Sequence, residues 1–210
     1  MSVQEVLQVM AAHRRRINDL EGIEIPFQAQ VPTGGGGTGV RDEIEEILPV
    51  GLNSFDFLNI PQVYKHLEVR YLARSDRVAS FETLNVRING LLTAGAHEHT
   101  RHQYTATADH IFFGTSSTRV DFAEVPSSLA DADEFGNGVV DFPYYKTTRF
   151  KGLLSYGGHW KDGVGLENHG SRNTGGRGES TVAITKLTFF LFAGDFVSPS
   201  KFILYGIDAA

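Results

Sequence analysis

The chain has 210 residues, no cysteine and a formal net charge of −6. The lack of thiols excludes disulfides, zinc–thiolate sites and cysteine nucleophiles, and the acidic balance argues against a nucleic-acid binder, which needs a basic face. A hydrophobic fraction of 41% with 15 phenylalanines predicts a folded core, and 23 glycines favour many tight turns in an all-β fold. No apolar stretch has the length of a membrane span, and no signal-peptide core is found, so we expect a soluble protein made in the cytosol.

The first 22 residues predict a short amphipathic helix. Its seam alternates spacings of three and four residues, as heptad a and d positions do: Val3, Val6, Met10, His13, Ile17 and Leu20. Such a short helix is marginal in water, and the chain offers no second long helix to cover the seam. We therefore expect a partner outside the chain, in a sister copy or a larger assembly. His13, at a d position, is a candidate for setting register or oligomeric state.

An extended arm is expected after Gly22. Apolar Ile23, Ile25 and Phe27 alternate with polar residues, and the enclosed proline indicates an edge strand or an outstretched arm. The glycine run over residues 34–39 is typical of a flexible linker, with a wide hairpin turn as the alternative. Residues 40–48 carry acidic side chains around Ile44 and Ile47, which fits a two-turn acidic helix ended by proline.

Strand signals repeat from Tyr64 onward. Apolar and polar residues alternate over 66–73 and 84–89, and Asn89-Gly90 is a strong turn signal. Further strands are expected at 103–108, 111–113, 139–142, 149–154, 182–192 and 201–207. About eight strands with glycine-rich turns predict a mainly β fold, an antiparallel jelly-roll-like β-sandwich with a short N-terminal α-helical arm. The expected parts are the helix and anchoring arm (1–32), a glycine-rich linker with a short connecting segment (33–62) and the sandwich (63–210).

Several of these strands carry a recognisable pattern. The segments are Tyr64-Lys65-His66-Leu67-Glu68-Val69-Arg70, Ala73-Arg74, Leu84-Asn85-Val86-Arg87-Ile88-Asn89-Gly90, Val139-Val140-Asp141-Phe142-Pro143-Tyr144, Ser155-Tyr156-Gly157-Gly158, Gly194-Asp195-Phe196-Val197 and Phe202-Ile203-Leu204-Tyr205-Gly206-Ile207. Over residues 64–207 the chain resembles tailed-bacteriophage virion structural proteins, whose sandwich closes on a Leu-Tyr-Gly-Ile strand. It departs from them at Leu91, where an acidic residue is usual. The resemblance implies a virion protein of the tail-fibre or head-decoration type.

Physical chemistry assigns structural roles to the motif residues. We expect Phe202 and Tyr205 to close the core, and Gly206 to permit a tight approach of backbones or a turn. Arg70 and Arg87 are expected on two strands of one sheet. There, cross-strand pairing with Glu68 or Asp141 is favoured over ligand binding.

Candidate binding residues are few. His97 and His99 share one face of a predicted strand and are weak candidates for zinc or nickel, although no further ligand is fixed by spacing. Aromatic side chains flanked by glycines form a candidate patch for glycan or host contact, with a core or subunit-interface role as the alternative: Tyr144, Tyr145, Tyr156, His159 and Trp160. The acidic cluster around Asp131 and Glu134 is interpreted as a surface loop. Catalytic motifs are missing, so we expect neither an enzyme nor a cofactor.

The sequence thus predicts a virion protein assembled in the host cytoplasm. The favoured role is a homotrimeric short fibre or tail-associated protein that anchors by its arm and displays the sandwich to the host surface. The alternative is a capsid decoration or cement protein whose arm bridges major-capsid subunits. A free carbohydrate-binding module is a second alternative. The expected partners are further copies of the chain, other virion proteins and a host surface glycan, without nucleic acid or membrane insertion.

Overall fold

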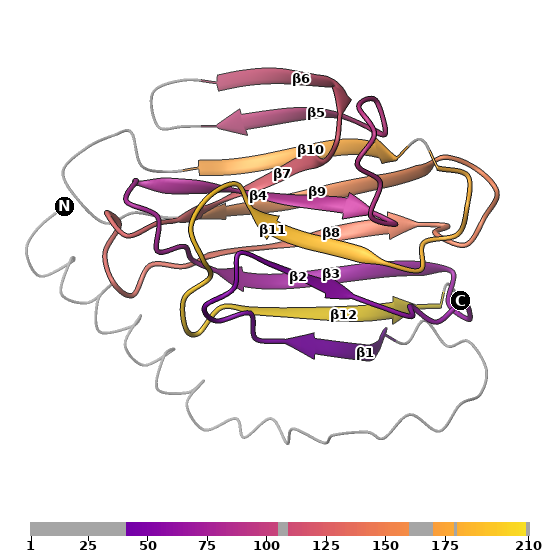
Figure 1. Ribbon diagram of the computed structural model, residues 1–210, viewed down its shortest axis with the longest axis horizontal. Coiled ribbons are helices and arrows are strands. Elements are labelled where there is room, and N and C mark those ends of the chain that lie inside the picture. The colour runs from indigo at the N-terminus through magenta and orange to yellow at the C-terminus, as the bar shows by residue number, and fades with distance from the viewer. Residues whose placement is uncertain (1–40, 105–108, 160–169, 179, 209–210) are drawn as a thin grey trace, which may run out of the picture. The chain divides into compact units, whose positions relative to one another are not determined.

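The computed structural model describes residues 41–104, 109–159, 170–178 and 180–208. Within these ranges the chain forms twelve strands and no helix, and the strands build two antiparallel sheets that pack as a β-sandwich (Figure 1). The expected mainly β, antiparallel sandwich is therefore confirmed. The predicted helix and arm lie outside the described residues, with their anchoring positions Val3, Val6, Met10, His13, Ile17, Leu20, Ile23, Ile25 and Phe27.

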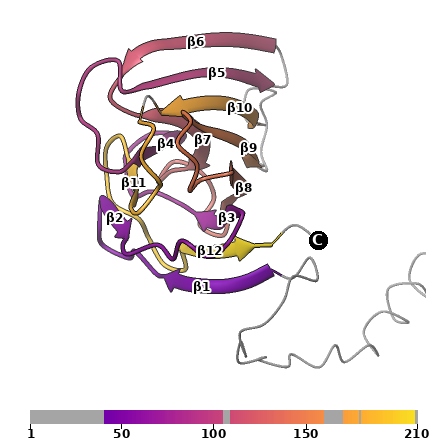
Figure 2. The same ribbon diagram turned by 90° about the vertical axis from the view of Figure 1, so that its right-hand side faces the viewer.

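The larger sheet has eight strands. In spatial order they are β1 (Arg41–Ile47), β12 (Lys201–Ile207), β3 (His66–Ala73), β8 (Gly136–Pro143), β9 (Lys151–His159), β10 (Gly170–Gly178), β5 (His97–Tyr104) and β6 (Asp109–Ser117). The smaller sheet has the order β2 (Ser54–Phe57), β11 (Leu187–Leu191), β4 (Phe81–Ile88) and β7 (Val120–Pro126). Its edge strand β7 packs against β9, β10 and β5. The hairpin β5–β6 continues the large sheet beyond that edge (Figure 2).

The chain passes back and forth between the sheets. The strands β1, β3, β8 and β12 belong to the large sheet, whereas β2, β4, β7 and β11 belong to the small one. Two hairpins, β5–β6 and β9–β10, are inserted into this alternation and widen the large sheet. The first and last described strands lie side by side, because β1 pairs with β12.

The core lies between the sheets and is rich in phenylalanine. On β3 the odd-numbered side chains from Leu67 to Ala73 point inward and are buried, and on β4 Leu84, Val86 and Ile88 do the same, as the alternation predicts. Phe202 is fully buried and contacts Phe55, with ring centroids 4.7 Å apart. Rings of this kind contribute large apolar areas and tilted or edge-to-face contacts.

Residues 41–47 form an edge strand, so the prediction of an acidic helix over 40–48 was wrong. Backbone pairing with β12 decides the conformation, and a bulge between Glu43 and Glu45 breaks the alternation that would have indicated a strand. Ile44 and Ile47 pack against the core, and the Oε2 atom of Glu46 lies 2.6 Å from Nζ of Lys201. Both β1 and β2 lie within the segment 33–62.

Arg70 and Arg87 lie in different sheets, on β3 and β4, contrary to the prediction that they share one. Arg70 does pair with Glu68, but along its own strand, at 2.7 Å between Nε and Oε1. Arg41 reaches the other carboxylate oxygen from β1, also at 2.7 Å. Tyr205 does not close the core. Its ring lies on the outer face, with the guanidinium groups of Arg41 and Arg70 over it.

Among the described residues no helix has the length and hydropathy needed to cross a membrane.

Candidate functional site

The described members of the predicted glycan patch do not lie on one surface. Tyr145 is fully buried, and its hydroxyl donates to the carbonyl oxygen of Pro61, so this residue belongs to the core. Tyr144 and Tyr156 are 63% and 51% exposed, but Tyr156 pairs with Val139, five residues before Tyr144 on the chain. At about 3.4 Å per residue they are roughly 17 Å apart along the strand.

The other members of that patch differ in status. His159 lies at the end of β9, on the alternate face from Tyr156, and is half-buried. Trp160 lies outside the described residues. Tyr144 has a left-handed backbone (φ 50°), and its ring packs edge-on against His66 with centroids 4.7 Å apart. Tyr144 and Tyr156 are therefore two separate exposed aromatic side chains and not parts of one patch.

His97 and His99 share the inner face of β5, as predicted, but His97 is a core residue. Its side chain is fully buried, and its Nε2 atom accepts a hydrogen bond of 3.1 Å from the Ile88 backbone N–H. Burial lowers the pKa of His97 to about 4, and the charges of Arg87 and His99 act in the same direction. No three metal-ligating side chains gather anywhere in the described residues.

A cleft opens where the β5–β6 hairpin overhangs β7. It has a volume of about 500 Å³, and its lining comes from the hairpin and from the start of β7: His99, Arg101, Phe112, Phe113, Gly114, Ser117, Thr118, Arg119 and Asp121. Gly114 is required there, because a β-carbon at this position would overlap the imidazole ring of His99. The hairpin thus presents polar and aromatic side chains to an edge that the small sheet leaves uncovered.

One carboxylate serves two arginines inside the cleft. Asp121 Oδ1 accepts from Arg119 Nε at 2.9 Å, and its Oδ2 atom lies 3.6 Å from Arg101 Nη1. The same Arg119 Nε donates to Oδ1 of Asn85 at 3.0 Å. Asn85 is fully buried on β4, so this hydrogen bond fixes the position of the Arg119 guanidinium.

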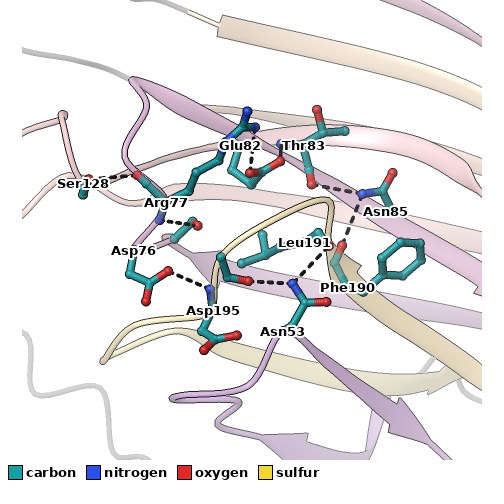
Figure 3. A network of polar contacts seen from close by, with 12 residues as sticks. Asn53, Asp76, Arg77, Glu82, Thr83, Asn85, Ser128, Phe190, Leu191 and Asp195 are labelled. Atoms are coloured by element: carbon teal, nitrogen blue, oxygen red, sulfur yellow. Dashed lines mark hydrogen bonds and ion pairs between the residues drawn. The ribbon is translucent and has the colours of Figure 1, made fainter.

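Asn85 is itself held by a polar network on the interior strands β4 and β11 of the small sheet (Figure 3). Its Nδ2 atom donates to the carbonyl oxygens of Thr83 at 3.0 Å and Phe190 at 3.4 Å. The Thr83 N–H donates to the carboxylate of Glu82, which forms an ion pair of 2.9 Å with Arg77. The floor of the cleft is therefore anchored through β4 and β11.

Aromatic rings support the arginines from the side. The guanidinium carbon of Arg101 lies 4.2 Å from the centroid of Phe112, and that of Arg119 lies 5.0 Å from Phe192. Arg87 borders the cleft: its Nε atom donates to the carbonyl oxygen of the lining residue Thr118 at 3.3 Å, and its guanidinium lies 4.0 Å from the Phe190 ring. Such stacking holds the planar groups in fixed orientations.

A second hollow lies on the outer face of the large sheet. Cross-strand register places Phe113, Thr100, Gly175 and Leu154 in one row, and Gly175 has open space where a β-carbon would be. The missing side chain leaves a groove of about 460 Å³ between Phe113 and Leu154. At its rim Arg177 pairs with Glu98 at 2.8 Å and lies over the ring of Phe150.

Exposed apolar side chains gather around this groove. Phe113 is 75% exposed, and further exposed apolar residues of the same outer face are Ile111, Leu154 and Tyr156. Phe150 at the rim is half exposed. We call these five residues, with the groove between them, the apolar patch. Contiguous exposed apolar surface of this kind is typical of an interaction site.

Neither the cleft nor the apolar patch was predicted from the sequence. The one local signal was the spacing of Arg119 and Asp121, which places opposite charges on the same face of a strand. Arg87 and Arg101 come from other strands, so only the folded chain brings them close. The glycine-rich segment of β10 carried no strand signal, although its missing side chains shape the groove.

Comparison of the chain with models of protein families, with curated proteins and with solved structures found no match.

Proposed function

We propose that the chain is a structural protein of a tailed-phage virion, a homotrimeric short fibre or tail-associated protein. Its N-terminal arm anchors it to the particle, and its sandwich is displayed for contact with the host surface. The role is a binding role, without catalysis, carried out after assembly in the host cytoplasm.

The strand order supports a jelly-roll reading of the sandwich. Without the two inserted hairpins, four strands remain in each sheet, in the orders β1-β12-β3-β8 and β2-β11-β4-β7. Consecutive strands alternate between sheets except at the β4–β7 pair, and the first strand lies beside the last. A double-sheet, eight-stranded arrangement of this kind is common in viral structural proteins, although it is also found in lectins.

The apolar patch is the observation that carries the proposal. A displayed domain that acted alone would leave Phe113, Leu154 and Tyr156 in water, whereas a second copy would cover them. The predicted seam over residues 1–22 also requires a partner. Further copies of the chain would cover both the apolar patch and this seam. Three copies agree with the homotrimeric fibre that we favour among the virion roles.

Sedimentation of the purified chain tests this arrangement. The full chain is expected to sediment as a trimer, and a variant lacking residues 1–22 is expected to yield monomers. A trimer that persists without these residues would refute the oligomerising role of the arm and leave the apolar patch as the sole contact. A full chain that sediments as a monomer would contradict the proposal itself.

Copy number separates the fibre from the capsid decoration protein. A decoration or cement protein, whose arm bridges major-capsid subunits, is expected in hundreds of copies per particle, and a tail fibre in tens or fewer. Quantitative gel densitometry of purified particles makes the distinction.

A carbohydrate-binding module is the third reading, favoured by the exposed ring of Tyr156 on the outer face. Replacing Trp160 with alanine is expected to abolish sugar binding or host adsorption without unfolding the chain if the predicted glycan patch is the contact. Unchanged adsorption would eliminate that patch.

A further inference from the structure

The cleft beneath the β5–β6 hairpin carries more positive than negative charge. Arg101 and Arg119 line it and share the single carboxylate of Asp121, at 3.6 Å and 2.9 Å. Arg87 borders it and has no ion-pair partner among the described residues. Two guanidinium groups thus line the cleft with one carboxylate and a third borders it, so among the described residues two positive charges have no counter-charge there, in a chain whose net charge is −6.

These charges are held close together although they repel one another. The side chains of Arg101 and Asp121 are about one-fifth exposed, so solvent screens them only in part. Burial lowers the pKa of Arg87, and the neighbouring charge of Arg119 lowers it further. Arginine stays charged in proteins, so this repulsion is a standing cost that an incoming anion would remove.

One arginine of the cleft also has a hydrogen-bond donor that is not used. The Nε atom of Arg101 is buried and has no acceptor among the described residues. Its contact with Asp121 is 0.7 Å longer than that of Arg119 (3.6 Å against 2.9 Å). A charged oxygen entering the cleft could accept from these donors, because ionised acceptors make the shorter and stronger bonds.

The guanidinium groups are preorganised for such a ligand. The guanidinium carbons of Arg101, Arg87 and Arg119 lie 4.2, 4.0 and 5.0 Å from the ring centroids of Phe112, Phe190 and Phe192, respectively. Asn85 also fixes Arg119 by a hydrogen bond. Little side-chain freedom is then lost on binding, which favours affinity. The cleft volume of about 500 Å³ lies within the range of roughly 300–1,000 Å³ found for small-molecule sites.

We propose that this cleft binds the acidic group, a carboxylate or a phosphate, of an anionic saccharide. Two uncompensated charges suit one acidic group and not a long polyanion such as nucleic acid, whose binding requires an extended basic surface. Ser117, Thr118 and the Asp121 carboxylate offer partners for sugar hydroxyls. The inference rests on the proposed host-surface role and names its ligand class.

The test uses the purified full chain with four sugars and inorganic phosphate as probes. Galacturonic acid and glucose 6-phosphate are titrated by calorimetry or ligand-observed NMR, with galactose and glucose as their neutral counterparts. At least one acidic sugar is expected to bind tenfold or more tightly than its neutral counterpart, and the tighter of the two identifies the acidic group. Equal binding of acidic and neutral sugars, binding of inorganic phosphate alone, or no binding would overturn the inference. This comparison needs no variant, so it does not depend on how a substitution folds.

Substitutions then place the site. Arg101→Gln and Arg87→Gln are each expected to weaken binding of the acidic sugar tenfold or more, whereas Arg101→Lys retains the charge and loses less. Arg70→Gln is the control, because it removes the same charge from β3, which lies four strands from β5 in the large sheet and roughly 19 Å away. Equal weakening by Arg70→Gln would contradict a site in the cleft.

Particle adsorption separates this inference from the proposed function. If Arg101→Gln abolishes sugar binding but leaves adsorption of the particle unchanged, the site is retained and its role in host contact is refuted. Particles that contain the chain, together with a purified chain that binds no acidic sugar, would refute the site and leave the virion role intact.

Discussion

The aromatic ring of Tyr64 occupies the space that a β-carbon on Gly206 would need. Three ring atoms of Tyr64 would overlap such a carbon, so the glycine of the closing Leu-Tyr-Gly-Ile strand accommodates a side chain and not a turn. Gly206 has an ordinary strand backbone, and Tyr64 is packed against the core at this point. The close approach predicted for Gly206 is therefore real, although the partner is a ring and not a backbone.

Replacing Gly206 with alanine is expected to destabilise the sandwich, because the Tyr64 ring must leave its packed position. Overpacking of this kind costs about 1–3 kcal/mol in free energy of unfolding. Gly175→Ala is the matched control, since a β-carbon there meets nothing within 4 Å. Urea unfolding should show a lower midpoint for Gly206→Ala only. Equal midpoints for the two variants would contradict the packing account.

His97 predicts a loss of stability in mild acid. Its pKa is about 4 in the folded chain and 6.5 when unperturbed, so between these values the unfolded chain binds a proton that the folded chain does not. Stability conferred by the neutral imidazole is therefore full above pH 6.5 and declines as the pH falls toward 4. The free energy of unfolding should drop by about 2 kcal/mol between pH 7.5 and pH 5 from this group alone.

The variant His97→Gln removes the titration while keeping an acceptor for the Ile88 N–H. Urea unfolding at the two pH values should then show a smaller pH dependence than in the parent chain, by roughly the same 2 kcal/mol. A pH dependence that is identical in both proteins would show that His97 is not the group responsible.

Arg74 is expected to hold the loop before β8. It is buried, and its guanidinium donates to the carbonyl oxygens of Ala130, Asp131 and Glu134. Arg74→Lys keeps the charge but cannot supply the same planar set of donors, so we expect a loss of about 1–3 kcal/mol. Cleavage within residues 127–135 by a nonspecific protease should accelerate in this variant. Arg149→Lys, at an exposed position, should leave both the stability and the cleavage rate unchanged.

The apolar patch predicts a self-association contact. Phe113→Ser should weaken the proposed trimer at least tenfold in concentration-dependent sedimentation, because the variant lacks the exposed ring that a second copy would bury. Folding should be little affected, since surface substitutions change stability by about 0.5 kcal/mol or less. Val78→Ser is the control at another highly exposed apolar position. If both variants assemble like the parent chain, the patch does not join copies of the chain.

Alternation predicted the strands whose own side chains form the core. The strand over 201–207 has the expected bounds, because Phe202 and Leu204 on its inner face drive its placement. The strand Gly170–Gly178 was not predicted, because it lacks alternating apolar side chains. It has four glycines and is held by backbone pairing to β9 and β5, and a β-carbon at Gly176 would crowd Val120 and Leu153. Tertiary pairing outweighs local propensity there.

The binding features depended even more on the folded chain. Arg87, Arg101 and Arg119 lie on or beside three strands that are separated in the sequence, and no local spacing relates them. Tyr145 illustrates the reverse error: it stands beside an exposed tyrosine in a polar stretch, but the fold turns it inward, where it donates to Pro61. Residue type indicated binding chemistry, but only topology determined which side chains meet.

Direct imaging of labelled particles tests the central claim. Purified virions are decorated with an antibody fragment against the sandwich and examined by electron cryomicroscopy. The account predicts label at the tail or its periphery, in copy numbers that are multiples of three and total tens or fewer. Hundreds of labels distributed over the capsid would support the decoration protein instead, and particles without label, with the chain found only free in the lysate, would contradict a virion role.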